Sequence, residues 1–251
     1  MPRLDLALVQ LGLAPSRTKA QALIAAGDVE IFKQGEWRVA DSASLVVEAP
    51  QLRLRPGAES LRYVSRGGLK LEAALDQLQL NVKGWRCLDV GLSTGGFSDC
   101  LLQRGAAHIV GVDVGHGQLS PTLHAEPRLR SFEGINARQL NQHAEVRSVA
   151  GHIDLCVVDV SFISLGQILP ALAEVLPGGA RLLALVKPQF EVGPAGLDKH
   201  GVVRDVALFA DVEAQVLQAL EKCGFTGLDY VACKVKGQDG NQEFFALALR
   251  R

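Results

Sequence analysis

The stretch LDVGLSTGGF at residues 88–97 decides the fold, because its pattern is that of a strand running into a glycine-rich turn and then a helix. In open α/β sheets, ligands bind at the carboxyl ends of the strands, where glycines remove side-chain bulk. The spacing differs from the GxGxxG of dinucleotide-binding proteins, and no Gly-Lys-Ser/Thr follows as in a phosphate-binding loop. We predict that this backbone closely approaches a ligand, the alternative being a tight turn of purely structural purpose.

Strand-like runs alternate with helical patterns after residue 61, which is typical of a parallel sheet with crossover helices. The predicted strands are Arg86–Val90, His108–Val112, Ile153–Val158 and Arg181–Val186. Near the C-terminal end, residues 228–236 and 243–249 flank a turn-rich segment, which predicts an antiparallel hairpin. The predicted fold class of residues 61–251 is therefore α/β.

The first sixty residues follow a different pattern, which predicts a small α+β domain at residues 1–60. Its expected helices and strands are Arg3–Leu11, Arg17–Ala26, Asp28–Phe32 and Ser44–Glu48. We expect Ser16 to cap the second helix, and the segment from Lys33 to Asp41, which contains Trp37, to be a loop.

Composition limits the function classes. With 251 residues, of which 48% are hydrophobic and 21% charged, the chain can bury a full core and still carry a small appended domain. No apolar run is long enough to cross a bilayer, and the first residues lack the layout of a signal peptide, so we expect a cytoplasmic protein. The five cysteines form no CxxC pair, which argues against a disulfide framework or a zinc site.

The net charge of -1 gives no overall attraction for nucleic acid, so any RNA contact must depend on local patches. The stretch with the largest excess of positive charge is 53–70, where Glu59 is the single acid among Arg53, Arg55, Arg62, Arg66 and Lys70. We predict a phosphate-facing patch there, and a solvated linker is the alternative. Arg17 and Lys19 fall at the start of a predicted helix. At such a position, basic side chains and free backbone N–H groups can bind the same phosphate.

Two polar residues extend the predicted ligand crevice. Asp113 ends the next strand, about one β-α-β step after the glycine turn, where a carboxylate accepts both ribose hydroxyls of a nucleoside cofactor. A strand-end cap is the alternative role for Asp113. Asn136 follows a third candidate strand and is placed to hydrogen-bond an adenine edge.

Four charged residues stand at strand ends or element starts: Lys70, Asp159, Lys187 and Glu243. Because the carboxyl ends of neighbouring parallel strands open on one crevice, Asp159 and Lys187 should face the same ligand. An isolated strand-end charge is more often solvated or salt-bridged. Two of them beside a nucleoside pocket favour a functional role.

With these motifs, the chain resembles the TlyA, or hemolysin-A-like, rRNA methyltransferases, whose catalytic domain is similar to the FtsJ-type ribose 2′-O-methyltransferases. The resemblance spans nearly the whole chain and is most specific at YVSRGGLKL (63–71), residues 89–100 and LVKPQFE (185–191), with KHGVVRD (199–205) adding to it. The front domain resembles the RNA-binding module first described in a small-subunit ribosomal protein, through residues 3–5 and 16–20.

The resemblance implies a Rossmann-like class I methyltransferase sheet that uses S-adenosyl-L-methionine to methylate a ribose 2′-hydroxyl, that of a cytidine, in ribosomal RNA of ribosomal subunits. It implies a catalytic tetrad of Lys70, Asp159, Lys187 and Glu243. In this tetrad we expect Lys187 to orient the hydroxyl and stabilise charge on its oxygen, and Asp159 to fix the lysine.

The expected binding residues form two groups. Cofactor contacts are expected from Asp89, Gly91, Ser93, Gly95, Gly96, Phe97, Asp113 and Asn136. RNA contacts are expected from Arg3, Arg17, Lys19, Arg62 and Arg66. Leu92 stands where the family often has a smaller residue and is expected to narrow the pocket. No metal site is expected.

Two other functions compete with this interpretation. A membrane-damaging hemolysin, which the family's name suggests, finds little support, since neither a spanning helix nor a long basic amphipathic helix is evident. A catalytically inert, RNA-binding ribosome-assembly factor is disfavoured by the intact glycine turn and tetrad. No heptad pattern or apolar stripe indicates an oligomeric state.

Overall fold

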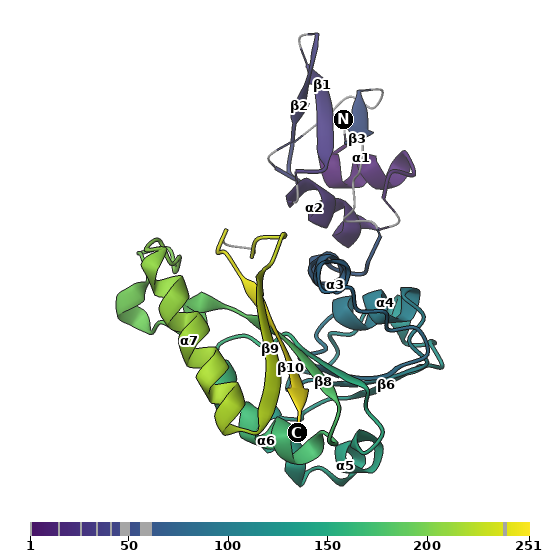
Figure 1. Cartoon of the computed structure of the whole chain (residues 1–251). Helices are drawn as coiled ribbons and strands as arrows, with labels where there is room; N and C mark the ends of the chain where they lie inside the picture. The colour runs from purple at the N-terminus through teal and green to yellow at the C-terminus, as the bar shows by residue number, and fades with distance from the viewer. Residues whose placement is uncertain are drawn as a thin grey trace. The chain divides into compact units, whose positions relative to one another are not determined.

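The computed structural model describes residues 2–14, 16–25, 27–33, 35–40, 42–45, 51–55, 62–237 and 240–251. The chain divides into two compact units, Met1–Arg66 and Gly67–Arg251 (Figure 1). The predicted boundary between residues 60 and 61 lies outside the described residues. Each unit is built around its own set of buried side chains.

The larger unit contains a seven-stranded sheet in the order β6-β5-β4-β7-β8-β10-β9. Its strands are β4 (Arg86–Val90), β5 (His108–Val112), β6 (Leu129–Phe132), β7 (Leu155–Val158), β8 (Arg181–Val186), β9 (Phe225–Ala232) and β10 (Phe244–Arg250). The first five strands pair in parallel, whereas β10 runs antiparallel to both β8 and β9. The predicted α/β class, Rossmann-like sheet and C-terminal hairpin are confirmed.

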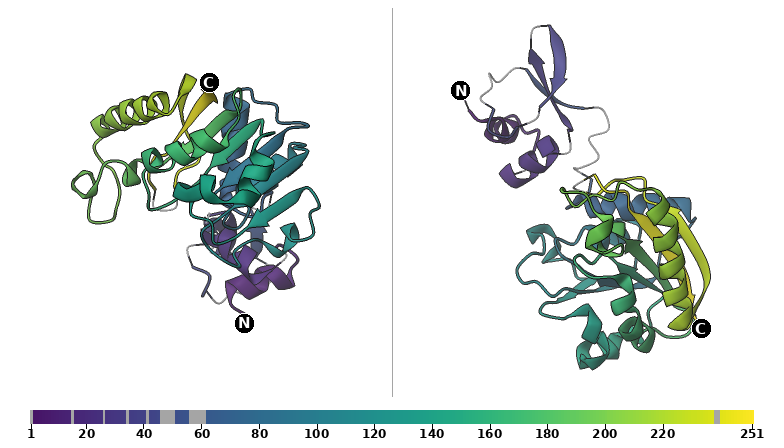
Figure 2. Two further views of the ribbon diagram at one scale, coloured as in Figure 1. Left: turned by 90° about the horizontal axis from the view of Figure 1, so that it is seen from below. Right: turned by 90° about the vertical axis from the view of Figure 1, so that its left-hand side faces the viewer.

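Helices cover both faces of this sheet (Figures 1 and 2). The helices are α3 (Arg66–Gln77), α4 (Gly96–Gln103), α5 (Ala144–Ala150), α6 (Leu169–Val175) and α7 (Ala207–Lys222). Leu88 and Val90 share one core with α5, α6 and α7. Because side chains alternate along a strand, Asp89 points to the opposite face, where it contacts Ser98 of α4.

The N-terminal unit packs two helices against a three-stranded antiparallel sheet of order β2-β1-β3. Its elements are α1 (Leu4–Gln10), α2 (Arg17–Ala25), β1 (Val29–Lys33), β2 (Glu36–Val39) and β3 (Leu52–Leu54). The Ser16 hydroxyl accepts a hydrogen bond from the Lys19 N–H at 3.2 Å, as expected of a cap for α2. Gly12, with φ of 70°, follows the end of α1.

Two predictions for the N-terminal sheet differ from the structure. The segment expected to be a loop, Lys33 to Asp41, contains β2, whose four residues are all solvent-exposed and so lack the alternation that would indicate a strand. The third strand is β3 at Leu52–Leu54. Of the strand predicted at 44–48, residues 46–48 lie outside the described residues, and residues 44–45 are not in a strand.

Candidate active site

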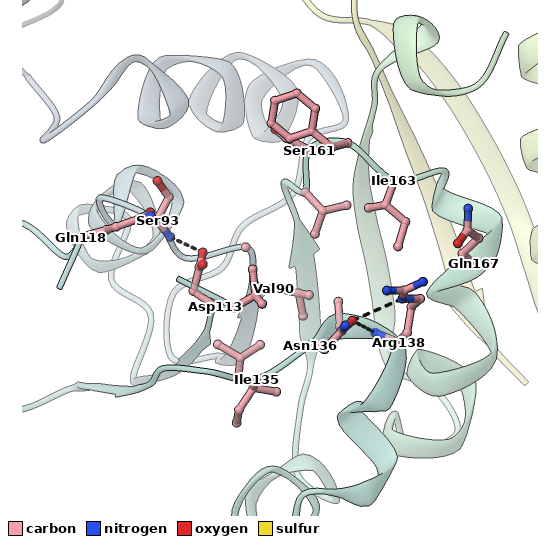
Figure 3. Close-up of a pocket in the computed structure, with 16 residues that line it drawn as sticks. Val90, Ser93, Asp113, Gln118, Ile135, Asn136, Arg138, Ser161, Ile163 and Gln167 are labelled. Carbon is pink, nitrogen blue, oxygen red and sulfur yellow. Dashed lines mark hydrogen bonds between the residues drawn. The ribbon is translucent and has the colours of Figure 1, made fainter. Parts of the chain in front are cut away.

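A cavity of about 600 Å³ opens at the carboxyl ends of β4, β5 and β7 (Figure 3). Its size falls within the ~300–1,000 Å³ of small-molecule sites. Four of the eight predicted cofactor residues line it: Gly91, Ser93, Asp113 and Asn136. Apolar side chains, such as Val112 and Ile135, form part of the wall. The cavity therefore combines an apolar body with a few polar groups.

Asp113 is held in place by backbone donors. Its two carboxylate oxygens accept hydrogen bonds from the N–H groups of Ser93, at 2.7 Å, and of Gly115, at 2.6 Å. These bonds fix the orientation of the carboxylate, and each oxygen keeps a second lone pair for a ligand hydroxyl. Asp113 thus ties the glycine turn to the end of β5 and still presents acceptors to the cavity.

Asn136 has a structural role beside its place in the cavity wall. Its side-chain oxygen accepts a hydrogen bond from the Arg138 N–H at 3.0 Å and so caps the 3-10 segment Ala137–Gln142 (Figure 3). An oxygen used in this way leaves the amide nitrogen as the group that can donate to a ligand.

Gly91 is required by the protein's own backbone. Its φ is 90°, and a Cβ there would collide with the carbonyl of Asp159. The backbone at Gly91 thus packs closely against the end of β7, and because Gly91 also lines the cavity, the predicted close approach to a ligand stays a prediction. Gly95, also at φ of 90°, leaves room for Leu119 and Leu123. Glycine at both positions sets the shape of the crevice.

The other predicted cofactor residues lie away from the cavity wall. Asp89 is fully buried and accepts a hydrogen bond from the Ser98 hydroxyl at 2.7 Å. Phe97 packs against Phe245, with ring centroids 6.2 Å apart. Gly96 begins α4 and is buried. These three residues shape the fold beneath the crevice.

Asp89 has an unusual protonation equilibrium. Burial is the main reason that its pKa rises to about 7, with the charges of Asp159 and Asp113 adding to the effect. One of its oxygens has no hydrogen-bond partner among the described residues.

Leu92 does not line the cavity, so the expectation that it narrows the pocket is wrong. Its side chain is 4% exposed and packs on Gly111 of β5, where a Cβ would meet it at 2.7 Å. A small residue in the neighbouring strand accommodates the larger one in the turn.

The four predicted catalytic residues form two ion pairs. Lys70 of α3 is 2.6 Å from Glu243, which directly precedes β10 and has a side chain only 3% exposed. Lys187, after β8, is 2.6 Å from Asp159, after the adjacent β7. Burial raises the pKa of the Cys233 thiol, and the charges of Lys70, Glu243 and Asp159 also act on it.

Ser161 connects the second ion pair to the cavity. Its hydroxyl accepts a hydrogen bond from Lys187 Nζ at 2.9 Å, and Ser161 itself lines the cavity wall. The Lys187 ammonium is thereby held by two oxygens at the cavity edge. The sequence offered a signal for Ser161, because it follows the strand-end Asp159 by two residues, but no role was predicted for it.

Phe162 is an exposed aromatic residue at the cavity. Its side chain is 91% exposed, and its φ of 64° lies in the left-handed region that favours glycine. Its ring lies 5.2 Å from that of Phe190, between centroids. Such local strain at a cavity wall suggests a functional constraint. Sequence reasoning assigned no role to either phenylalanine.

Glu191 joins the loops that follow β7 and β8. Its two carboxylate oxygens accept hydrogen bonds from the Ser164 hydroxyl at 2.6 Å and from the Leu165 N–H at 2.8 Å. The same loops carry the Lys187–Ser161 contact and the pair of phenylalanine rings. Glu191 therefore positions both loops at the cavity.

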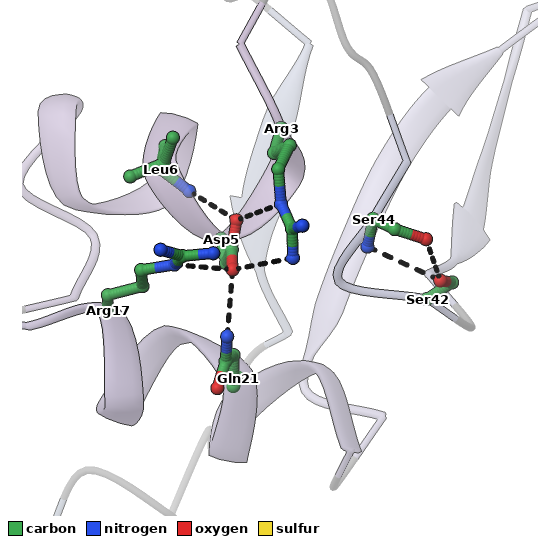
Figure 4. A network of polar contacts seen from close by, with 7 residues as sticks. All are labelled: Arg3, Asp5, Leu6, Arg17, Gln21, Ser42 and Ser44. Carbon is green, nitrogen blue, oxygen red and sulfur yellow. Dashed lines mark hydrogen bonds and ion pairs between the residues drawn. The ribbon is translucent and has the colours of Figure 1, made fainter.

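In the N-terminal unit, Arg3 and Arg17 converge on the buried Asp5 (Figure 4). Burial on its own raises the pKa of Asp5, but hydrogen bonds from Arg17, Gln21 and Arg3 outweigh it and hold this pKa well below its usual range. The two arginine side chains remain 44% and 52% exposed, so they still present charge to solvent.

The other predicted RNA contacts are placed as follows. The Lys19 ammonium donates a hydrogen bond to the Tyr63 carbonyl at 2.5 Å. The Arg62 guanidinium lies 5.5 Å from the Tyr63 ring centroid, and Arg66 is the first residue of α3. Within the basic stretch, Arg53 and Arg55 both pair with Glu30, and residues 56–61 lie outside the described residues.

The described part of the chain offers neither a metal-binding cluster nor a membrane-spanning helix. No cluster of three or more His, Cys, Asp or Glu residues is placed to hold a metal ion. No helix in the described ranges is long and apolar enough to cross a membrane. The five cysteines are free thiols.

Comparison with known proteins identifies the family. The FtsJ-like methyltransferase family matches residues 63–250. The 16S/23S rRNA (cytidine-2′-O)-methyltransferase TlyA of Mycobacterium tuberculosis is 41% identical over 97% of this chain and 88% of its own length. Hemolysin A of Brachyspira hyodysenteriae is 36% identical over 97% of this chain and 98% of its own length.

A solved structure agrees with these relatives. A protein of Streptococcus thermophilus described as a hemolysin is 38% identical, covers 99% of this chain and 88% of its own, and superposes with a TM-score of 0.75. The chain therefore belongs to the FtsJ-like methyltransferase family, in the group formed by the TlyA and hemolysin A proteins.

Proposed function

We propose that this chain transfers a methyl group from S-adenosyl-L-methionine to the ribose 2′-hydroxyl of a cytidine in ribosomal RNA. The observation that carries the proposal is the Lys187–Asp159 ion pair, which Ser161 connects to the edge of a nucleoside-sized cavity. The choice of cytidine and of ribosomal RNA is supported by the TlyA relative, which is named for that reaction.

The cavity fits the methyl donor. Asp113 presents acceptors suited to two ribose hydroxyls, the Asn136 amide can donate to an adenine edge, and Val112 and Ile135 offer an apolar surface to a base. S-adenosyl-L-methionine bound there would supply a methyl group activated by its sulfonium. Its S–CH3 bond would break as the C–O bond to the 2′ oxygen forms, releasing S-adenosyl-L-homocysteine, and the hydroxyl proton would pass to water.

The role proposed for Lys187 follows from its surroundings. A ribose hydroxyl is a poor nucleophile at neutral pH, so the protein must align it and stabilise the charge that develops on its oxygen. Asp159 and Ser161 fix the Lys187 ammonium, which leaves little orientational freedom to be lost when it donates to the 2′ oxygen. The Lys70–Glu243 ion pair completes the proposed set of four catalytic residues, and it links α3 to the start of β10.

Phe162 supports a nucleoside substrate. An exposed ring at the cavity wall, held against Phe190, provides a face on which a base can stack. A base held there would bring its own ribose toward Ser161 and Lys187, since Ser161 is the preceding residue. Glu191 would act as a positioning residue for this surface.

The N-terminal unit is proposed to bind ribosomal RNA within ribosomal subunits, through Arg3, Arg17, Lys19, Arg62 and Arg66. The exposed parts of Arg3 and Arg17, oriented by Asp5, support this role. Such a substrate places the reaction in the cytoplasm. The resemblance of this unit to a ribosomal-protein module belongs to the same proposal.

Incubation with tritiated S-adenosyl-L-methionine and isolated ribosomal subunits tests the proposal. We expect label in RNA, recovered as 2′-O-methylcytidine after digestion to nucleosides. Unlabelled RNA together with tight subunit binding would favour a noncatalytic assembly factor. Lysis of erythrocytes without RNA label would favour a hemolysin.

A further inference from the structure

The sheet of the N-terminal unit carries an aromatic cluster that we call the Trp37 platform, made of Phe32, Trp37 and Arg53. Phe32 and Trp37 are register partners on β1 and β2, and their ring centroids are 5.2 Å apart. The Arg53 guanidinium of β3 lies 4.1 Å from the Trp37 ring centroid. The platform therefore extends across all three strands of the sheet.

This platform is separate from the core of its unit. Along β1, Val29 and Ile31 are buried in the core, so the alternating Glu30 and Phe32 point to the other face. Trp37 is 37% exposed, and Val39 beside it on β2 is 50% exposed. The platform thus lies on the face of the sheet opposite the buried core.

Two arginines give this face hydrogen-bond donors suited to phosphate. Glu30 pairs with Arg53 at 2.7 Å and with Arg55 at 3.9 Å, and Asp28, the cross-strand neighbour of Arg55, is a second acid beside them. The arginine side chains are about half exposed, at 46% and 52%. A guanidinium stacked on an indole offers a flat surface and phosphate donors at one place.

We propose that the Trp37 platform binds single-stranded RNA, with a base stacked on Trp37 and the adjoining phosphates on Arg53 and Arg55. This inference rests on the proposed RNA substrate and adds a second RNA contact to the N-terminal unit. Single-stranded RNA is recognised by aromatic and guanidinium planes beside cations. Protein-binding hot spots are also rich in Trp and Arg, so binding of a protein is kept as an outcome of the test.

Tryptophan fluorescence gives a direct test, because Trp37 and Trp85 are the two tryptophans of the chain. In the full-length Trp85→Phe variant, only Trp37 reports. Titration with a 12-nucleotide single-stranded RNA of uridine and cytidine should quench this fluorescence in a saturable way. Binding of the same RNA, fluorescently labelled and followed by anisotropy, should weaken about 5- to 30-fold in Trp37→Ala.

Trp37→Phe is the matched control, because it keeps an aromatic face and should stay within about 3-fold of the parent. Circular dichroism checks that each variant is folded. Unchanged Trp37 fluorescence at saturating RNA overturns the proposal, as does equal affinity of the Ala variant. Quenching by RNA-free ribosomal proteins but not by RNA also overturns it, in favour of a protein partner.

Methylation of ribosomal subunits, measured in parallel, separates this inference from the proposed function. Methyl transfer without quenching means that the platform assignment is wrong while the enzymatic function stands. Quenching without methyl transfer supports the platform as an RNA contact and contradicts the function.

Discussion

Replacing Lys187 with Met tests the proposed chemistry most directly. The variant keeps the length and apolar stem of the side chain but removes the ammonium that lies 2.6 Å from Asp159 and 2.9 Å from Ser161. Removing one preorganised donor to a developing oxyanion typically costs about 10²–10³-fold in rate. We therefore expect methyl transfer to fall by at least about 100-fold, or ~2.7 kcal/mol in the barrier.

The same variant should leave cofactor binding nearly unchanged, because Lys187 does not line the cavity. It should also lose stability, since Asp159 is left without its cation. We expect about 1–2 kcal/mol, less than for a fully buried pair, because the Asp159 side chain is 23% exposed.

The assay is transfer of tritiated methyl groups to ribosomal subunits, with cofactor affinity measured by calorimetry. Lys222→Met, which changes an exposed lysine at the end of α7, is the matched control and should keep full activity. Methyl transfer by Lys187→Met within 5-fold of the parent would refute the proposed role of this ammonium.

Three further predictions follow from single residues. Phe162→Gly should raise the melting temperature slightly, because glycine adopts a φ of 64° without strain. The same variant should lower methyl transfer about 5- to 100-fold, because it removes the ring on which a base stacks. Full activity of the variant would contradict the proposal. Thermal melts should show Asp89→Asn becoming more stable relative to the parent as the pH rises from about 4 to 7. The reason is that the raised pKa of Asp89 makes the folded parent bind more protons than the unfolded chain in this pH range. A difference in melting temperature between variant and parent that does not change with pH would contradict this. Asp5→Asn should destabilise the N-terminal unit by about 1–3 kcal/mol above pH 4 in urea unfolding followed by Trp37 fluorescence in the Trp85→Phe background. This loss should shrink as the pH falls below about 4, since the depressed pKa means that the parent then loses the same charge contacts; a loss that is constant with pH would argue against the Asp5 network.

Four parallel strands of the larger unit were predicted closely because their patterns are local. The bounds of β4, β5 and β8 agree with the structure, and β7 starts two residues later than predicted. Short apolar runs between turn residues indicate buried strands without knowledge of their neighbours. The exposed β2 carries no such pattern, because its pairing with β1, and not burial of its own side chains, makes it a strand.

The glycine turn shows which contacts can be predicted from local sequence and which cannot. Its pattern predicted a close approach to a ligand, and the structure adds a second close approach, between Gly91 and the Asp159 carbonyl, 68 positions along the chain. Only the pairing of β4 with β7 brings these two backbones together. Asp89 was predicted from its place before the glycines, and only the packing of α4 on β4 shows that its buried carboxylate accepts a hydrogen bond from the Ser98 hydroxyl.

The sequence by itself determined the α/β class, the glycine turn and the charged residues at strand ends, because each depends on neighbours within a few positions. The tertiary structure alone decided how those charges combine. Lys187 pairs with Asp159 because β7 and β8 are adjacent, and Lys70 pairs with Glu243 across α3 and β10. It also revealed Phe162 as an exposed ring, since exposure depends on what the rest of the chain leaves uncovered.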